Sequence, residues 1–164
     1  MKTLYVIRHA KSDRSLSDLS DFERPLNERG LKDAPEMARR LTARGVKPDL
    51  VVSSTANRAL TTARIFADVL GYPAGDILEM HELYAADAET VFDIVQRLAP
   101  GAETVLLFGH NPTVTDFVNR AAGVRIDHMP TCATAAVALP GTWQDAEPGS
   151  GSLALFDYPK NTAR

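Results

Sequence analysis

The sequence is poor in cysteine and has no long apolar run. Its single cysteine, Cys132, cannot form a disulfide within the chain and offers no second thiol for a zinc or redox site. No segment approaches the roughly 18 apolar residues that a membrane-spanning helix requires. The first apolar run, residues 4–7, ends at Arg8 and is too short for the core of a signal peptide. These absences predict a cytoplasmic protein.

The chain also lacks a marked excess of charge of one sign. Its 18 lysines and arginines against 21 acidic residues give a formal net charge of −3. This balance provides no basic surface for nucleic acid or for an anionic membrane, so we expect neither as a partner. The 164 residues are 45% hydrophobic and 24% charged, which is typical of one globular domain, here residues 1–164.

Short apolar runs alternate with amphipathic segments along the chain. Extended runs are predicted at residues 4–7, 50–52, 77–83, 104–108, 133–139 and 153–158. Helices are predicted at residues 27–44, 59–70, 87–98 and 112–122. This alternation predicts a three-layer α/β/α fold with a mostly parallel sheet. The polar, aperiodic residues 11–26 are predicted to form a long surface loop.

Polar residues follow three of the predicted strands. Arg8 and His9 follow the first run, Arg58 comes shortly after the second, and His110 follows the fourth. Ligands of open α/β sheets bind at the carboxyl ends of the strands, so we expect these side chains to converge on one edge. Two arginines and two histidines repel one another unless a dianion lies among them, and a phosphoryl group supplies that charge. The sequence therefore predicts a phosphate site.

The candidate residues suit phosphoryl transfer through a covalent intermediate. A neutral imidazole held at one nitrogen is a nucleophile at the other, so His9 can form a phosphohistidine that water then hydrolyses. Arg8, Arg58 and His110 can stabilise the charge on the transferred group without a metal or other cofactor. Glu82, at the end of the third extended run, is the best-placed acid to protonate the leaving group.

Several of these residues also have ordinary structural explanations. Glu82 could be a surface carboxylate paired with a nearby arginine. Ser12 could contact the phosphate or belong only to the loop. A metal site built from His9, His110 and Glu82 is disfavoured because the neighbouring arginines would repel a divalent cation. His81 would point away from Glu82 in an extended segment, and we assign it no role.

Taken in order, these residues resemble the histidine phosphatase (phosphoglycerate-mutase-like) superfamily. The matching motifs are Arg8-His9-Ala10, Ser53-Ser54 with Arg58 and residues 59–63, Glu82-Leu83-Tyr84, and Gly109-His110-Asn111-Pro112. The short chain and its residues 24–30 are similar to the SixA-type phosphohistidine phosphatases. The resemblance implies His9 as the nucleophile and Arg8, Arg58 and His110 as the phosphate pocket.

Two positions depart from the superfamily's pattern. Ala10 stands where glycine is most common, a change that small SixA-type members tolerate. The segment Lys11-Ser12-Asp13 offers no asparagine where the mutases have one, which argues against mutase activity. In SixA-type members the acid is also less clearly defined, because a phosphorylated imidazole is a good leaving group.

We therefore predict a metal-independent phosphatase that hydrolyses a phosphomonoester or a protein phosphohistidine through a phospho-His9 intermediate. Its partner is the phosphorylated substrate, and the resemblance implies a phosphohistidine-bearing protein. Ser12 joins Arg8, Arg58 and His110 as a candidate phosphate-binding residue. The alternatives are a broad-specificity small-molecule phosphatase or mutase-like enzyme and, outside enzymes, a phosphoanion-binding regulatory domain. Homodimerisation is left open.

Overall fold

The computed structural model describes residues 1–162, which contain six strands and four α-helices. The strands are β1 (Lys2–Arg8), β2 (Leu50–Ser53), β3 (Leu78–Glu79), β4 (Thr104–Gly109), β5 (Thr134–Leu139) and β6 (Ser152–Asp157). The helices are α1 (Glu28–Ala43), α2 (Asn57–Leu70), α3 (Ala88–Gln96) and α4 (Thr113–Ala122). Three short 3₁₀ turns are η1 (Ala74–Asp76), η2 (His81–Leu83) and η3 (Trp143–Asp145).

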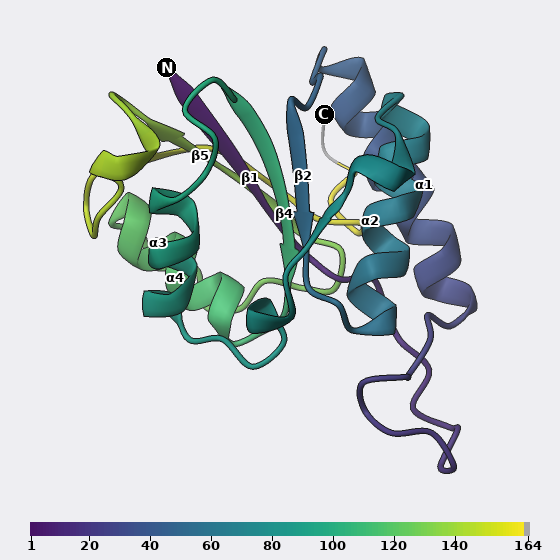
Figure 1. Cartoon of the computed structure of the whole chain (residues 1–164). Coiled ribbons are helices and arrows are strands. Elements are labelled where there is room, and N and C mark those ends of the chain that lie inside the picture. Colours follow the sequence, from purple (N-terminus) through teal and green to yellow (C-terminus); the bar gives the residue numbers. More distant parts are fainter. Residues whose placement is uncertain (163–164) are drawn as a thin grey trace.

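The six strands form one mixed sheet in the order β3-β2-β4-β1-β5-β6 (Figure 1). The first four in that order are parallel, whereas β5 and β6 are antiparallel to their neighbours. In the register, Arg8 pairs with Gly109 and Ser53 pairs with Phe108. The carboxyl ends of β1, β4 and β2 therefore meet at one edge of the sheet, as the strand-end rule predicts.

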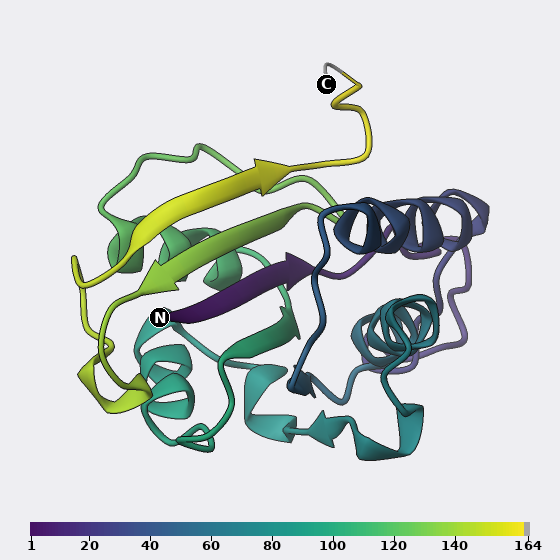
Figure 2. The same cartoon turned by 90° about the horizontal axis from the view of Figure 1, so that it is seen from above.

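Helices cover both faces of this sheet (Figures 1 and 2). On one face α1 and α2 bury residues such as Met37 and Phe66 against Phe108 of β4. On the other face α3 and α4 bury residues such as Ile94 and Phe117. The predicted three-layer α/β/α fold is confirmed. No helix within residues 1–162 is long and apolar enough to cross a membrane.

The start of α1 shows why its residues form a helix there. Asn27 is the N-cap, and its side-chain oxygen accepts a hydrogen bond of 2.9 Å from the Gly30 amide. A β-carbon at Gly30 would collide with the Lys11 carbonyl, so only glycine permits this close approach. The helix continues through Pro35 and ends before Gly45, which has a positive φ of 78°.

The loop of residues 11–26 projects beyond the carboxyl edge of the sheet (Figure 1). It has neither helix nor strand, as predicted, apart from an isolated bridge between Ser12 and Leu26. Its base is closed by a hydrogen bond of 2.8 Å from the Asp13 amide to the Pro25 carbonyl. Its far part is attached to α2, where the Asn57 amide donates to the Phe22 carbonyl at 3.0 Å. The loop is thus closed at its base and tied to α2 at its far part.

The prediction of an extended segment over residues 77–83 is wrong in its second half. Only β3 is strand, because this edge strand pairs with β2 alone and only through Leu78 and Glu79. The chain then turns into η2, where the Leu83 amide donates to the Met80 carbonyl at 3.0 Å. This turn buries Leu83 in the core. Glu82 therefore lies in a 3₁₀ turn, not at a strand end.

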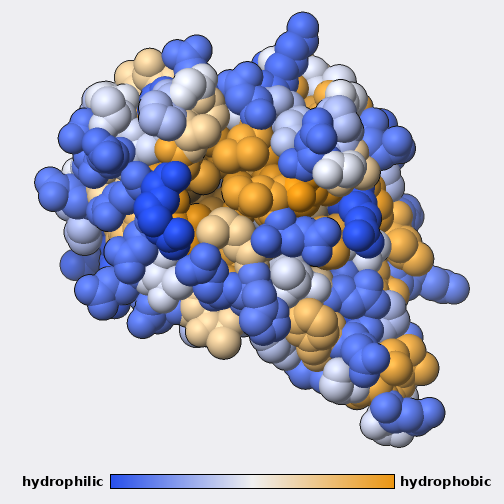
Figure 3. Space-filling view, viewed as in Figure 1, coloured by the Kyte–Doolittle hydropathy of each residue, from blue (hydrophilic) through white to orange (hydrophobic). Residues whose placement is uncertain are grey.

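An apolar surface lies beside this edge strand. Figure 3 shows apolar side chains gathered in the middle of the face on which β2 lies in Figure 1. A shallow cleft of about 290 Å³ is found here, lined by Leu50, Leu78, Met80, Ile94, Arg97, Leu98 and Ala99. The cleft is separate in its lining residues from the polar edge described next.

Candidate active site

His9 follows β1 directly, and only 5% of its surface is exposed. Its Nδ1 lies 2.7 Å from the Ala10 carbonyl oxygen. A carbonyl can only accept, so Nδ1 carries the proton and the Nε2 atom keeps a free lone pair. The backbone of His9 is held between β4 and the turn that precedes β5, with hydrogen bonds of 3.1 Å to the Gly109 carbonyl and 3.0 Å from the Cys132 amide. The ring is therefore fixed in the tautomer that a nucleophile needs.

The electrostatic surroundings keep His9 neutral. Burial, followed by the charges of His110, Arg58 and Arg8, lowers the pKa of His9 to about 3, although the hydrogen bond to Ala10 acts in the opposite direction. Near neutral pH the imidazole is therefore uncharged, with its single proton on Nδ1. The neutral ring is the form that can attack phosphorus, through the lone pair of Nε2.

His110 follows β4, and its ring centroid lies 5.3 Å from that of His9. Its Nε2 is 2.8 Å from the Ser54 hydroxyl, which accepts from the Ala56 amide at 3.2 Å. That hydroxyl can donate its own hydrogen to Nε2, which leaves the proton of the neutral ring on Nδ1. Burial and the Arg58 charge lower the pKa of His110 to about 4. His110 is thus suited to donate a hydrogen bond while uncharged.

Arg58 lies at the start of α2 and is buried, whereas Arg8 at the end of β1 is partly buried. Arg58 Nη1 donates to the Asp21 carbonyl at 2.7 Å, and its Nη2 donates to the Asp21 carboxylate at 3.0 Å. Arg8 Nη1 donates to the Met129 carbonyl at 3.0 Å. Both arginine charges lower the pKa of both imidazoles, so the two cations act on the same small volume.

Three buried donors in this cluster have no hydrogen-bond partner in the protein. They are Arg8 Nε, Arg58 Nε and His110 Nδ1, and among the described residues the only other such atom is Thr134 Oγ1. Leaving a buried polar group unpaired costs about 1–3 kcal/mol, and folded proteins have few such groups. Their concentration around one nucleophilic ring fits an oxyanion that accepts from all three.

Ser12 lies beside this cluster in the wall of a cleft. The cleft has a volume of about 440 Å³ and is lined by Arg8, His9, Lys11, Ser12, Asp13, Arg14, Ser15, Asn27 and Thr131. The Ser12 side chain is buried, and its hydroxyl accepts a hydrogen bond from Arg24. A hydroxyl that accepts can still donate, so a contact from Ser12 to a phosphate stays a prediction.

Glu82 is not joined to the cluster. Its side chain is exposed and forms an ion pair of 3.3 Å with Arg97. Within residues 1–162 no hydrogen bond or ion pair links it to Arg8, His9, Arg58 or His110. The structure thus brings four of the predicted residues together, and it pairs Glu82 with Arg97. Its role as the acid stays a prediction.

Asp21, in the loop of residues 11–26, was missed by the sequence analysis. Its carboxylate accepts from Arg58 and from Arg24, each at 3.0 Å, and from the Tyr84 hydroxyl at 2.7 Å. The Tyr84 hydrogen bond and the arginines hold the pKa of Asp21 below its usual range. The loop has no periodic pattern that would have singled out this aspartate.

His81 takes part in an aromatic group next to His110. Its Nδ1 is 2.7 Å from the Thr55 hydroxyl, and its ring packs 5.6 Å from that of Phe22. Tyr84 packs edge-on against both Phe22 and His110, with centroid distances of 5.0 and 5.7 Å. The expectation that His81 points away rested on an extended backbone, which η2 replaces.

The charge of the cluster suits an anion. In the part of the chain that the structure describes, no three or more His, Cys, Asp or Glu residues are grouped so that they could hold a metal ion. The positive charges of Arg8 and Arg58 next to His9 attract a phosphoryl group instead.

Comparison with known proteins agrees with this chemistry. The sequence profile of the histidine phosphatase superfamily (branch 1) matches residues 4–100. An uncharacterized protein of Mycobacterium tuberculosis is 31% identical over 166 residues, which cover 94% of this chain and all of that protein. An uncharacterized protein of Mycobacterium leprae is 30% identical, with the same two coverages.

Solved structures of histidine phosphatases are also similar to this chain. The protein histidine phosphatase SixA in complex with tungstate superposes with a TM-score of 0.82 and 27% identity, covering 96% of this chain and 97% of that one. A protein assigned as the phosphohistidine phosphatase SixA of Agrobacterium tumefaciens gives 0.81 and 27%, covering 96% and 98%. The chain therefore belongs to the histidine phosphatase superfamily, and it is a phosphatase with a phosphoglycerate-mutase-like fold of the SixA type.

Proposed function

We propose that this phosphatase hydrolyses protein phosphohistidine without a metal, through a phosphorylated intermediate on His9. One observation carries the proposal: a neutral, buried His9 with its Nδ1 proton held by Ala10 lies in a cluster with three unpartnered donors of Arg8, Arg58 and His110. A nucleophile alone would suit many reactions. A nucleophile among donors for an oxyanion suits phosphoryl transfer.

In the first step the Nε2 lone pair of His9 attacks phosphorus. A P–N bond to His9 forms while the bond from phosphorus to the leaving nitrogen breaks, and that nitrogen takes a proton from solvent. Arg8, Arg58 and His110 donate to the non-bridging oxygens, where negative charge is concentrated. In the second step water attacks phosphorus, its proton passes to solvent, and His9 regains its lone pair as inorganic phosphate leaves.

The choice of phosphohistidine as the substrate class has two supports. The cleft beside His9 has a volume of about 440 Å³ and is bordered by the exposed Lys11 and Arg14, so a residue on a protein surface can reach it. The pairing of Glu82 with Arg97 fits a leaving group that needs little help from an acid. The two SixA proteins at 27% identity carry the same substrate class in their names.

The decisive test replaces His9. His9→Ala is expected to abolish turnover of a phosphorylated histidine-containing domain, and to remove the acid-labile phosphate that should be trapped on the unaltered protein. His128→Ala is the matched control, because that histidine is exposed and outside the cluster. Turnover by the unaltered protein and by His128→Ala is also measured with and without a metal chelator. Normal turnover by His9→Ala would disprove the mechanism. Loss of turnover by the unaltered protein in the presence of the chelator would disprove metal independence.

The alternative substrate class is a small phosphomonoester. It predicts turnover of sugar phosphates or p-nitrophenyl phosphate at least as fast as that of the phosphorylated domain. Phosphomonoesters release a poor leaving group, so they also require an acid. If Glu82 supplies that proton, Glu82→Gln slows the phosphomonoesters and leaves phosphohistidine unaffected. Equal rates of the unaltered protein and Glu82→Gln on every substrate would show that Glu82 is not the acid.

A further inference from the structure

Arg8 differs from Arg58 in that its guanidinium is held by a backbone carbonyl alone, whereas Arg58 also pairs with the Asp21 carboxylate. Its Nη1 donates to the Met129 carbonyl at 3.0 Å, and within residues 1–162 it forms no ion pair with a carboxylate. Arg14 and Arg58 are the neighbouring charges that act on it, and both repel it. The direction in which Arg8 points its unpartnered Nε therefore depends on where the Met129 carbonyl lies.

Met129 is held at both of its backbone polar groups by two side chains. Asn111 Nδ2 donates to the Met129 carbonyl at 2.8 Å, and the Thr115 hydroxyl accepts from the Met129 amide at 3.0 Å. The two side chains are joined, because the Thr115 hydroxyl donates to Asn111 Oδ1 at 2.7 Å. The Met129 side chain is fully buried in the core. The result is a closed set of hydrogen bonds around one residue.

The Met129 carbonyl accepts from Asn111 and from Arg8 together. A carbonyl oxygen has two lone pairs, so the Asn111 amide occupies one and Arg8 the other. If Asn111 were absent, the carbonyl could turn and take Arg8 with it. The other polar contact of the Asn111 amide is with His128 Nδ1 at 3.2 Å on an exposed side.

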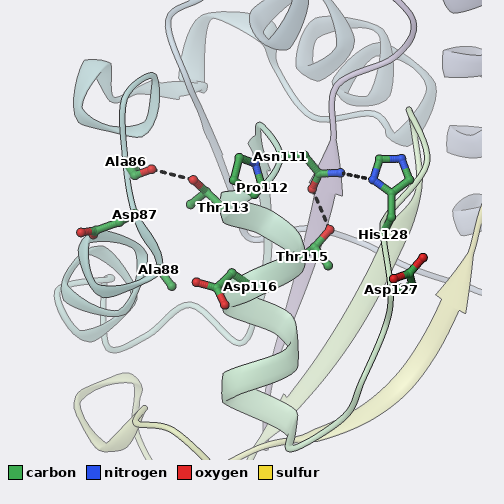
Figure 4. A pocket seen from close by; sticks show the side chains of 10 residues that line it. All are labelled: Ala86, Asp87, Ala88, Asn111, Pro112, Thr113, Thr115, Asp116, Asp127 and His128. Carbon is green, nitrogen blue, oxygen red and sulfur yellow. Dashed lines mark hydrogen bonds between the residues drawn. The ribbon is translucent and has the colours of Figure 1, made fainter.

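The outer side of this arrangement faces a cavity. Figure 4 shows Asn111, Thr115 and His128 in the wall of this cavity, with Thr113 bonded to Ala86 across it. The cavity is open to solvent and has a volume of about 600 Å³. Water from the cavity can therefore hydrogen-bond to the groups that a truncated Asn111 side chain leaves behind. Removal of that side chain should disturb the orientation of Arg8 more than it disturbs folding.

We propose that Asn111 is a positioning residue for phosphoryl transfer, which with Thr115 fixes the Met129 carbonyl and thereby aims Arg8 at the phosphoryl group. The proposal rests on the proposed function only in that Arg8 belongs to the phosphate pocket. Asn111 acts through Arg8 and does not itself contact the phosphoryl group.

The test measures the affinity for tungstate or inorganic phosphate by calorimetry, which requires no turnover. Asn111→Ala is expected to weaken binding about tenfold, which corresponds to two hydrogen bonds of modest net strength. In the Arg8→Ala background the same substitution should change affinity less than about twofold, since the residue it acts through is gone. In the Arg58→Ala background the loss should again be about tenfold.

Thr113→Val is the matched control. It removes a hydrogen bond of 2.6 Å to the Ala86 carbonyl in the same turn of α4, on the other side of the cavity. Thr113→Val should bind the anion within about twofold of the affinity of the unaltered protein, because the lost hydrogen bond lies outside the anion pocket. Circular dichroism checks folding, and if Asn111→Ala does not fold, Thr115→Val is used in the same three backgrounds, with an expected loss of about threefold.

Equal losses with and without Arg8 would overturn the proposal, because a merely structural effect weakens every background alike. Unchanged affinity in a folded Asn111→Ala protein would overturn it as well. These outcomes are independent of the chemistry at His9: if His9→Ala kept full activity, the proposed function would fail, while the binding cycle would still report on Arg8.

Discussion

The two arginines of the pocket carry the same charge but are supported in different ways. Arg8 is held by the Met129 carbonyl, a neutral group fixed by Asn111 and Thr115 at the sheet edge. Arg58 is held by the carbonyl of Asp21 and by its ionised carboxylate, whose side chain is 57% exposed in the loop of residues 11–26. A neutral support is insensitive to salt and to pH, whereas an exposed ionic one is screened. The support of Arg8 is therefore a buried residue held by neutral groups, whereas that of Arg58 depends on a surface loop.

The support of Arg58 extends along the loop. Three successive carbonyls, those of Asp21, Phe22 and Glu23, accept from Arg58 Nη1, the Asn57 amide and Asn57 Nδ2 at 2.7, 3.0 and 2.9 Å. The first two residues of α2 thus hold the loop while the loop holds Arg58. We therefore expect the order of the loop and the placement of Arg58 to be coupled.

The largest expected effect comes from removing either arginine. Arg8→Ala and Arg58→Ala should each lower kcat/KM about 100-fold, the typical loss when one donor to a reacting oxyanion is removed. Only Arg58→Ala should also loosen residues 11–26, since Asp21 loses its partner. Hydrogen exchange of the loop measures this difference. Equal protection of residues 11–26 from exchange in the two variants would contradict the proposed difference between the supports of Arg8 and Arg58.

A smaller effect is expected from Asp21→Asn, which removes the charge and keeps the shape. Asp21 is largely exposed, and exposed ion pairs contribute up to about 1 kcal/mol, so kcat/KM should fall no more than about fivefold. Loop exchange should become faster, while Asn111→Ala leaves it unchanged. A rise in phosphate affinity would instead mean that Asp21 competes with the phosphoryl group for Arg58.

Acid should destabilise the fold through the two imidazoles. Their folded pKa values of about 3 for His9 and about 4 for His110 lie below the usual value of 6.5. Below that value the unfolded chain binds protons that the folded chain does not, so stability falls as the pH drops from 6.5 toward 3–4. Asp21 has a lowered pKa and stays ionised over this range.

Urea unfolding at pH 7 and pH 5 measures this loss of stability. The loss should shrink in His110→Ala, because one of the two depressed groups is gone. It should persist in Asp21→Asn, because that carboxyl does not titrate between the two pH values. A loss that vanished in Asp21→Asn would assign the pH dependence to the loop side of the pocket.

The smallest expected effect is a difference in salt dependence. At about 0.5 M salt the screening length is a few ångströms, so the ratio of activities of Asp21→Asn and the unaltered protein should move toward one. The corresponding ratio for Asn111→Ala should not change, because its hydrogen bonds join neutral groups. Parallel salt curves for the two variants would contradict the distinction between an ionic and a neutral support.

Local sequence patterns are enough to predict the layers of the fold and four residues of the candidate site. Apolar periodicity predicts the strands and helices, and the strand-end rule predicts that Arg8, His9, Arg58 and His110 lie at one edge of the sheet. Both signals are local or follow from the direction of parallel strands. They need no knowledge of how loops pack.

The groups that hold these arginines in place could not be predicted from sequence patterns, because they come from distant loops. Asp21 reaches Arg58 across 37 residues and Met129 reaches Arg8 across 121, through loops that have no periodic pattern. Glu82 was expected at the end of a strand, but it lies in the 3₁₀ turn that follows the two-residue edge strand β3. A single hydrogen bond between distant loops produces no periodic pattern in the sequence. The direction of a side chain also changes when a 3₁₀ turn takes the place of an extended backbone.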